Sequence, residues 1–388
     1  MKRRFSVLIS LLFAVVLFSG GCSSANDVDR VPGKTYPLVV LHTNDSHGTI
    51  LPADGQGGLA ERATYINTVR AENENVLLLD AGDINVGTAF SNFFNGDIDI
   101  TAYNMMKYDA ATFGNHEFDY TLKKIEDQMK LADFPFLSAN IKRADGKYLG
   151  RPWIVKNYDG FRIGIFGLTT LRTLTIASPD KSLNFINELT AAEEALRYLR
   201  EKEKCDIVIA LTHMGLTGEE KGHITSVDLA QWVPDIDLII DGHSHTLMYE
   251  PVFVGTVPIV SANEWGKYVG TAAYEITDGS ITSFTWKAEP INEKDVLTYP
   301  PDPDVTAMIE PYRIMADLLL KEVVAQAAGE FEAGDKLSRK KETALGIWLM
   351  TELCGMPGKF SGRIPILLLP MAAISALLFL RAMLQGKI

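Results

Sequence analysis

The amino-acid sequence predicts an α/β domain between Tyr36 and about Pro290. Short apolar runs alternate there with segments of helical spacing, and five candidate strand ends are each followed by Asp, Asn or His. Strands that alternate with helices are typical of α/β domains, whose functional residues collect beyond the carboxyl ends of the strands. The sequence therefore predicts one polar site built from five separate strand ends.

The predicted elements follow one another along the chain. The apolar runs expected to be buried strands are Leu38–His42, Val76–Asp80, Ala110–Phe113, Phe161–Leu168, Asp206–Leu211 and Leu238–Asp241. Helical spacing predicts helices at Leu59–Glu72, Leu122–Leu131 and Ala191–Glu203. Three later runs without intervening helices indicate a β-rich end of the domain: Val257–Ser261, Tyr268–Ile276 and Ile281–Lys287.

Composition agrees with a folded chain. With 388 residues, of which 47% are hydrophobic and 22% charged, the chain is long enough for two to three domains and is not globally disordered. A formal net charge of −12 argues against a nucleic-acid polymer as partner, because phosphate backbones need basic surfaces. Cys22, Cys205 and Cys354 cannot form a disulfide framework. Core burial, together with any bound metal, must therefore hold the fold.

The N-terminus has the pattern of an export signal over residues 1–22. Lys2 to Arg4 are basic, the run Phe5–Phe18 is apolar, and small residues precede Cys22. The apolar run is shorter than the roughly 20 residues of a membrane-spanning helix. The small residues resemble a bacterial lipoprotein site, in which Cys22 would be lipidated, although Ser19 stands where leucine is usual. The alternative is a plain secretory signal, and either places the protein in or beyond the cell envelope, with residues 23–35 as a tether.

Five of the seven histidines fall at the predicted strand ends. Asp, His and Asn without Cys favour divalent ions such as Zn, Mn, Fe or Mg. Asp45 and His47 are two residues apart, so on an extended segment both side chains would point to one side, and His243 and His245 repeat the spacing. Six or seven ligands suit two ions that share a bridging carboxylate, an arrangement that binds a phosphate ester and activates water.

Four motifs give the chain a specific resemblance: LHTNDSHG at 41–48, GDINVGT at 82–88, FGNHEFDY at 113–120 and IDGHSHT at 240–246. Together they resemble the 5′-nucleotidase family of the calcineurin-like metallophosphoesterase superfamily, over about residues 36–346. The resemblance implies a four-layer α/β/β/α sandwich at residues 36–295. It also implies hydrolysis of a nucleotide or related small phosphate ester outside the cytoplasm, with two divalent metal ions (Zn, Mn or similar) as cofactors.

The resemblance also implies a role for each site residue. The first metal would be held by Asp45, His47 and His245. Asp83 would bridge the two ions, and the second would be held by Asn115, His213 and His243. His116 would not be a ligand.

Two residues would act directly in the chemistry. His116 would donate a hydrogen bond to the phosphoryl oxygen and stabilise developing charge, while Asp119 would fix its tautomer and keep it protonated. Asn115 and His116 would thus both lie at the substrate phosphate. Glu117 and Asp80 are expected to support the site structurally, and His42 is expected to be a strand core residue. The pair His116–Asp119 favours catalysis over the alternative, a non-catalytic, metal-stabilised surface lipoprotein.

The C-terminal part departs from the family pattern. Pro300 to Pro303 indicate a linker, and helical spacing over about Val305–Gln326 predicts a bridging helix within residues 296–330. Residues 331–346 resemble the start of a C-terminal domain that, in the family, binds the nucleoside. Residues 347–388 then contain a single acidic residue and a 17-residue apolar stretch with two prolines. We expect either a shifted reading frame, which would impair substrate binding, or a membrane anchor; the sequence does not indicate the oligomeric state.

Overall fold

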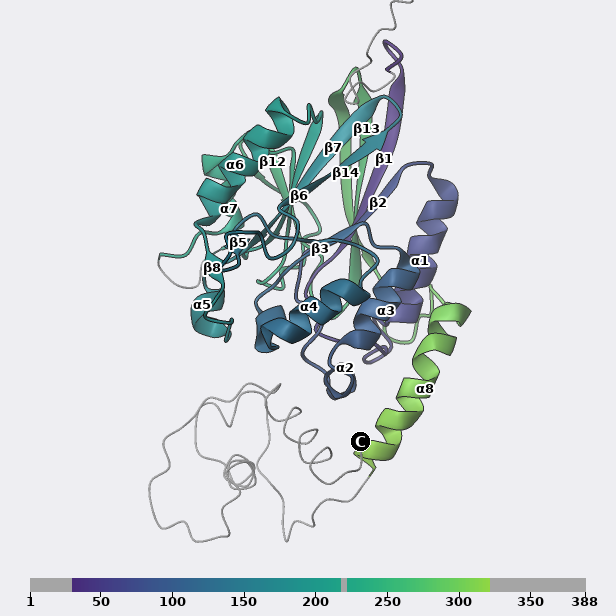
Figure 1. Ribbon diagram of the computed structural model, residues 1–388. Helices are drawn as coiled ribbons and strands as arrows, with labels where there is room; N and C mark the ends of the chain where they lie inside the picture. The colour runs from purple at the N-terminus through teal and green to yellow at the C-terminus, as the bar shows by residue number, and fades with distance from the viewer. Residues whose placement is uncertain (1–29, 218–221, 322–388) are drawn as a thin grey trace, which may run out of the picture.

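Two six-stranded sheets pack face to face between outer layers of helices (Figure 1). The structure is a computed structural model that describes residues 30–217 and 222–321. The layer order is α/β/β/α, as the family resemblance implied. The predicted signal peptide, residues 23–29 of the predicted tether, and residues 322–388 lie outside the described residues.

The first sheet has the strand order β14-β13-β1-β2-β3-β4. Its strands are β1 (Thr35–Thr43), β2 (Val76–Asp80), β3 (Ala110–Thr112), β4 (Phe136–Leu137), β13 (Tyr268–Thr277) and β14 (Ser280–Pro290). β1 to β4 run parallel, while β13 pairs antiparallel with both β1 and β14. The late strand β13 therefore returns to the first strand of the domain.

The second sheet has the order β11-β12-β10-β9-β7-β6. Its strands are β6 (Trp153–Tyr158), β7 (Phe161–Thr169), β9 (Ile207–His213), β10 (Leu238–Asp241), β11 (Val252–Val254) and β12 (Val257–Val260). β7, β9, β10 and β12 run parallel, so their carboxyl ends share one edge. A small separate sheet joins β5 (Ile141–Lys142) and β8 (Asn184–Phe185).

Three apolar layers hold the sandwich together. In β1, Leu38 and Val40 pack between the two sheets, and Val39 and Leu41 pack towards the helices of the first sheet. A strand buried on both faces is apolar at every position, which explains why these strands were visible as continuous runs. The third layer lies between the second sheet and its helices.

The helices cover the outer faces, as Figure 1 shows. They are α1 (Leu59–Glu72), α2 (Ala89–Phe93), α3 (Asp97–Met106), α4 (Leu122–Leu131), α5 (Thr173–Ile176), α6 (Glu188–Glu201), α7 (Ser226–Trp232) and α8 (Pro303–Leu320), with a 3₁₀ turn η1 at His116–Asp119. The predicted bounds of α1 and α4 are confirmed, whereas α2 and α3 were not predicted.

Caps explain where two helices differ from their predicted starts. α6 begins at Glu188 rather than Ala191 because the Asn187 side chain accepts hydrogen bonds from the next helical N–H groups. α8 begins at Pro303 because Asp302 caps it in the same way. α8 packs on α1 and α3, with Val305 and Ile309 buried in the core of the first sheet.

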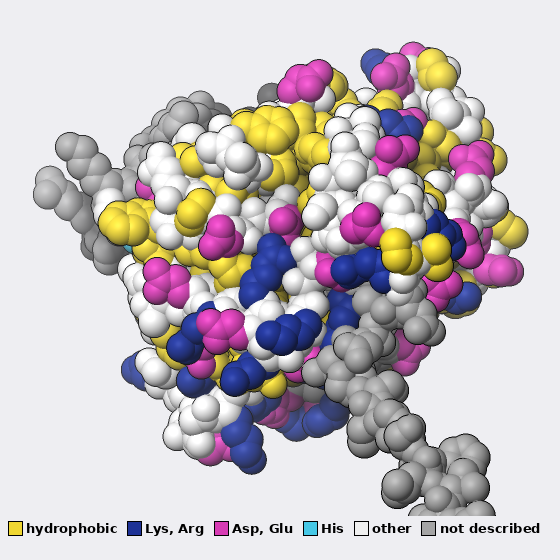
Figure 2. Space-filling view, turned by 90° about the horizontal axis from the view of Figure 1, so that it is seen from above, with side chains coloured by type: hydrophobic (Ala, Val, Ile, Leu, Met, Phe, Trp, Pro, Cys, Tyr) yellow, Lys and Arg dark blue, Asp and Glu magenta, His cyan; other side chains and the backbone are white. Residues whose placement is uncertain are grey.

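Figure 2 views the sandwich from the end at which β1 begins, away from the carboxyl ends of the parallel strands. Lys and Arg side chains lie there interspersed with Asp and Glu side chains, so this face carries both signs of charge. Among residues 30–217 and 222–321, no helix combines the length and the apolar character needed to cross a bilayer.

Candidate active site

Five strand ends from both sheets converge at one edge of the sandwich. Asp45 and His47 follow β1, Asp83 follows β2, and Asn115 and His116 follow β3. The second sheet contributes His213, the last residue of β9, together with His243 and His245 after β10. All eight side chains are therefore brought to the carboxyl edge that the sequence predicted.

Five of these residues have left-handed backbone conformations. The φ angles are 50° at Asp45, 46° at His47, 54° at Asp83, 76° at His243 and 52° at His245. The expectation that Asp45 and His47 share one side of an extended segment is therefore wrong: tight reversals, not strand alternation, turn these side chains inward. Positive φ is uncommon outside glycine and costs roughly 1–3 kcal/mol per residue, so it concentrates where function needs it.

Two glycines allow the loops after β2 and β3 to approach each other. A Cβ on Gly82 would lie 2.5 Å from the backbone N of Gly114, and a Cβ on Gly114 would lie 2.1 Å from Asp83 Oδ1. Any side chain at either position would push the two loops apart. The glycines of the GDINVGT and FGNHEFDY motifs therefore set the position of the Asp83 carboxylate.

The first ligand group consists of Asp45, His47 and His245, whose ligand atoms all lie within 4.8 Å of one another. The two Nε2 atoms are 3.0 Å apart, and His245 Nε2 is 3.4 Å from Asp45 Oδ1. His47 Nδ1 lies 3.2 Å from the Val86 carbonyl oxygen and His245 Nδ1 lies 2.5 Å from Glu264 Oε2. Protons on the outer Nδ1 atoms leave both Nε2 lone pairs directed at the site, as metal-binding histidines require.

The second group contains Asp45, Asp83 and His213, again within 4.8 Å. His213 Nε2 is 3.1 Å from Asp83 Oδ2 and 3.9 Å from Asp45 Oδ1, while its Nδ1 donates to the Ala81 carbonyl at 2.8 Å. Nε2 is buried and makes no hydrogen bond of good geometry to any residue that the structure describes. A lone pair buried against two carboxylates fits a metal ion better than it fits the protein alone.

Asn115 and His243 adjoin this second group. Asn115 Oδ1 lies 2.8 Å from His243 Nδ1, and the His243 backbone N–H donates to both Asp45 carboxylate oxygens at 3.0 Å. Burial is the main reason that the pKa of His243 falls to about 4, with the charge of His213 adding to it. His243 is therefore neutral at ordinary pH, which is the form that binds a metal.

The buried carboxylates of Asp45 and Asp83 strongly stabilise positive charge in the site. Burial lowers the pKa of His213, but the charges of Asp83 and Asp45 outweigh it and raise that pKa to about 10. Burial would likewise raise the pKa of Asp83, yet the charges of His213 and His116 hold it well below its usual value. The same field that attracts protons would attract a divalent cation in their place, so the donor set fits the implied metals.

His116 lies beside this cluster and is oriented by two contacts. Its Nδ1 is 2.7 Å from Asp119 Oδ2, and its backbone N–H donates to Asp83 Oδ1 at 2.8 Å. Burial lowers its pKa, but the charge of Asp83 and the hydrogen bond to Asp119 outweigh burial and raise the pKa to about 9. The ring stands edge-on to His47 at 5.2 Å, and 35% of the side chain is exposed. The protonated, partly exposed His116 side chain therefore lies next to the two ligand groups.

Two acidic residues expected to support the site do bind backbone around it. Glu117 accepts hydrogen bonds from the N–H groups of Asp83, Ile84 and Gly114 at 2.6–3.0 Å. Asp80 accepts from the Gly82 N–H and from the hydroxyls of Thr43 and Tyr103. Both side chains are buried, and Glu117 joins the loops after β2 and β3 while Asp80 fixes the start of the loop after β2.

Three supporting residues were missed by the sequence analysis. Glu264 contacts His245, Arg62 donates to Ser46 Oγ at 2.8 Å between two candidate ligands, and Asp241 accepts from the Met214 N–H next to His213. Glu264 and Arg62 do not directly follow a predicted strand. Asp241 ends one, but no role in the site was predicted for it. Their partners are distant in sequence, so no local pattern marks them.

The other singled-out residues lie elsewhere. His42 is buried between the sheets and stacks on Trp286, which confirms it as a strand core residue. Cys205 is a free, buried cysteine. Cys22 lies outside the described residues.

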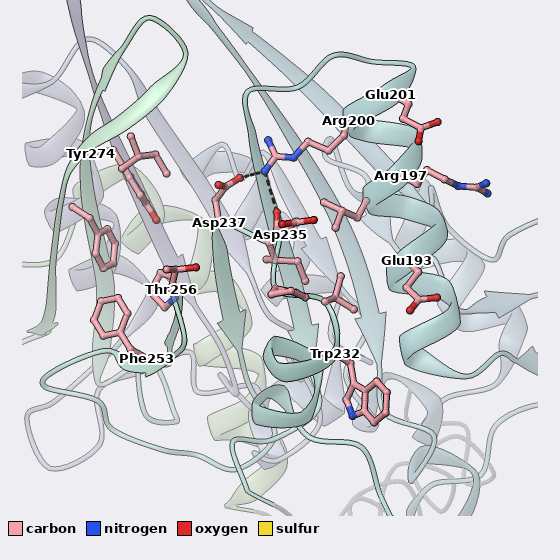
Figure 3. Close-up of a pocket in the computed structure, with 17 residues that line it drawn as sticks. Glu193, Arg197, Arg200, Glu201, Trp232, Asp235, Asp237, Phe253, Thr256 and Tyr274 are labelled. Carbon is pink, nitrogen blue, oxygen red and sulfur yellow. Dashed lines mark hydrogen bonds and ion pairs between the residues drawn. The ribbon is translucent and has the colours of Figure 1, made fainter.

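Two cavities differ in what they contain. One of about 540 Å³ is lined by His47, His116 and His245 together with apolar side chains. A larger one, of about 840 Å³, lies among α6, α7, β11 and β14 (Figure 3). In it Arg200 is already bonded to Asp237, and none of the candidate ligands lines it. The smaller cavity is therefore the candidate active-site cavity, because the candidate ligands His47 and His245 line it together with His116.

Comparison with known proteins agrees with this geometry. Residues 38–247 match the model of the calcineurin-like phosphoesterase family. The chain is 34% identical over 385 residues to a 5′-nucleotidase of Vibrio cholerae, covering 88% of this chain and 69% of that protein. It is 31% identical over 398 residues to the protein UshA of Yersinia enterocolitica, covering 90% and 71%. The chain is a calcineurin-like phosphoesterase of the 5′-nucleotidase family.

Solved structures extend this 5′-nucleotidase family likeness to the fold. The 5′-nucleotidase precursor of Thermus thermophilus superposes with a TM-score of 0.69 at 28% identity, covering 82% of this chain and 68% of that one. The calcineurin-like phosphoesterase YfkN of Bacillus subtilis superposes with a TM-score of 0.64 at 25% identity, covering 74% and 100%. As a member of this family, the chain is a metal-dependent phosphoric ester hydrolase.

Proposed function

We propose that this phosphoesterase hydrolyses the phosphate ester of a nucleotide or a related small molecule outside the cytoplasm. The observation that carries the proposal is the protonated, partly exposed His116 beside two groups of ligand atoms that share Asp45, with Asp83 of the second group also within 3.8 Å of His47 in the first. A closed structural metal site needs neither an open face nor a cationic donor next to it. This arrangement favours catalysis over a purely structural site.

The residues divide into two ligand sets around one carboxylate. Asp45, His47 and His245 would hold one ion, and Asn115, His213 and His243 the other. Asp83 would bridge them, because its Oδ2 lies 3.8 Å from His47 Nε2 and 3.1 Å from His213 Nε2. Two divalent ions, such as Zn or Mn, would supply an activated water and neutralise charge on the phosphate.

The chain's own contribution to the reaction comes from His116. Asp119 accepts from Nδ1, so the Nε2 proton is directed into the cavity, where it donates to a phosphoryl oxygen as negative charge grows. The charge of Asp83 keeps His116 protonated. Asn115 places its amide at the same phosphate, beside the second ion.

The decisive experiment measures metal content and phosphate release together. Purified protein loaded with Mn²⁺ or Zn²⁺ is assayed against AMP, a UDP-sugar and p-nitrophenyl phosphate. We expect about two ions per chain and phosphate release that stops on chelation and returns with metal. Protein that holds its ions but hydrolyses none of these esters would instead be a non-catalytic surface lipoprotein.

We also propose an incomplete nucleoside site and export to the cell envelope. The first rests on the changed composition of residues 347–388, and predicts hydrolysis with little preference among nucleotides. The second rests on residues 1–22, and a relative described as a precursor supports it. Incorporation of labelled palmitate by the wild type and not by Cys22→Ala would identify Cys22 as the lipidated residue, whereas equal release of both into the periplasm would indicate a plain secretory signal.

A further inference from the structure

The cavity beside the ligand groups has an unusual wall. Apart from three histidines, the side chains that line it are mainly apolar, and they include Ile50, Leu51, Phe90 and Trp265. Leu51 is 41% exposed and Trp265 is 42% exposed. Ligand sites typically combine such an apolar wall with a few polar groups that fix orientation. The three histidines are those that would lie at the metal ions and the phosphate, so the apolar wall beside them faces the rest of the ester.

Trp265 is held firmly in this wall. Its φ of 59° is an outlier for a bulky residue, and its backbone N–H donates to the Asp45 carbonyl oxygen at 2.7 Å. Asn263, two residues earlier, has a φ of 64°, and its carbonyl accepts from the Asn44 side chain at 2.5 Å. The loop that carries the indole is therefore tied directly to the loop that carries Asp45.

The indole is also fixed from one side. Lys267 Nζ lies 4.2 Å from the centre of the Trp265 ring, a cation–π contact, and 4.0 Å from Glu264 Oε1. Glu264 in turn contacts His245. A large aromatic surface that stays partly open, on a strained loop bonded to two candidate ligands, is poorly explained by packing alone.

We infer that Trp265 is a specificity-determining residue that packs against a flat aromatic leaving group, such as a phenyl ring or a nucleobase. This inference rests on the proposed phosphoesterase activity of the same site. Aromatic surfaces stack on any flat ring, so the contact favours aromatic over small aliphatic esters without distinguishing one base from another.

The test compares two esters across a set of variants of the full 388-residue chain. Phenyl phosphate and methyl phosphate are assayed with the wild type, Trp265→Ala, Trp265→Gly and Trp265→Phe. Glycine is included because it accepts the positive φ without strain. Trp232→Ala is the matched control, since Trp232 is 67% exposed and lines the other cavity (Figure 3). Comparing the ratio of the two kcat/KM values between each variant and the wild type cancels the difference in intrinsic reactivity of the two esters.

We expect this ratio to fall about tenfold in Trp265→Ala and Trp265→Gly, the scale of one lost stacking contact. It should recover in Trp265→Phe and stay unchanged in Trp232→Ala. An unchanged ratio in both the alanine and the glycine variant overturns the inference, whatever happens to the absolute rates.

A binding measurement separates this inference from the proposed function. Calorimetry gives the affinities of phenylphosphonate and methylphosphonate, which are not hydrolysed, for the same variants loaded with Mn²⁺. A selective loss of about tenfold for phenylphosphonate in Trp265→Gly supports the aromatic contact even if no ester is turned over. Equal losses for both phosphonates in every Trp265 variant would show a general disturbance of the site, and Trp265 would then be structural.

Discussion

Two fully buried histidines show how differently the two parts of this sandwich treat the same side chain. His42 lies between the sheets, stacked on Trp286 with ring centres 5.2 Å apart, and neither of its ring nitrogens has a hydrogen-bond partner among the described residues. Burial alone lowers its pKa to about 3. His213, equally buried at the end of β9, faces Asp83 and Asp45, and its pKa rises to about 10.

The difference lies in the neighbours, not in the depth of burial. Between the sheets an imidazole meets only apolar surface, so the neutral form is the only one tolerated. At the carboxyl edge two buried carboxylates reverse the preference and stabilise positive charge, whether it comes from a proton or from a metal. A buried histidine indicates a metal site only where such carboxylates converge on it.

The largest effect is expected from removing the Asp83 carboxylate, which helps to stabilise positive charge at the carboxyl edge of the sheets. Asp83→Ala should lose both ions and all measurable hydrolysis, because Asp83 Oδ2 lies between the two ligand groups. Metal content by mass spectrometry and phosphate release check this. Asp145→Ala is the control, because Asp145 lies in an exposed turn where its side chain contacts Lys147. Full retention of one ion in Asp83→Ala would remove the bridging role.

His116→Ala tests a residue that lies beside the metal ligands but is not proposed to bind a metal ion. We expect both ions to remain bound and kcat to fall by roughly 10²–10³, the scale of one lost transition-state donor. Metal analysis on the same sample is essential, because His116 lies within ligand distance of His47 and Asp83. A variant that loses an ion would identify His116 as a ligand.

Glu264→Gln tests whether a carboxylate that contacts a candidate metal ligand also strengthens metal binding at the carboxyl edge. Glu264 contacts His245 Nδ1, and removal of its charge should weaken metal binding in the Asp45–His47–His245 group by roughly 10–100-fold. Metal titration should show one weakened site and one unchanged site. Equal weakening of both sites would mean that Glu264 supports the fold of the loop rather than one histidine.

The smallest effect concerns acid stability at His42. Its pKa of about 3 lies below the ordinary value of 6.5, so the folded state binds fewer protons than the unfolded state between these values. Stability is therefore complete above pH 6.5 and is lost as pH falls towards 3. Relative to the wild type, His42→Phe, which keeps a ring to stack on Trp286, should gain roughly 2 kcal/mol between pH 7.5 and 4.5.

Urea unfolding of both proteins at the two pH values measures this difference. The comparison cancels the titration of the metal-site histidines, which both proteins share. A difference that does not change with pH would show that His42 is not held neutral by burial.

Much of the fold was visible in the sequence because its strands are buried on both faces. β1, β2 and β10 are continuous apolar runs, and the apolar residues of α4 are spaced so that they fall on one helix face, so local pattern sufficed for these elements. α2 and α3 escaped prediction, and α6 and α8 began earlier than expected, because short helices and caps depend on single side chains such as Asn187 and Asp302.

The sequence by itself determined which candidate ligands meet at the site, since each lies at or just beyond the carboxyl end of a strand. Only the tertiary structure decided how they meet. The His213–Ala81 hydrogen bond spans 132 residues and joins the two sheets, the contact of Glu264 with His245 comes from a loop that no motif marks, and five of the side chains turn inward through left-handed backbone. The reason is physical: hydropathy reports burial, while the packing of two sheets decides which buried charges face one another.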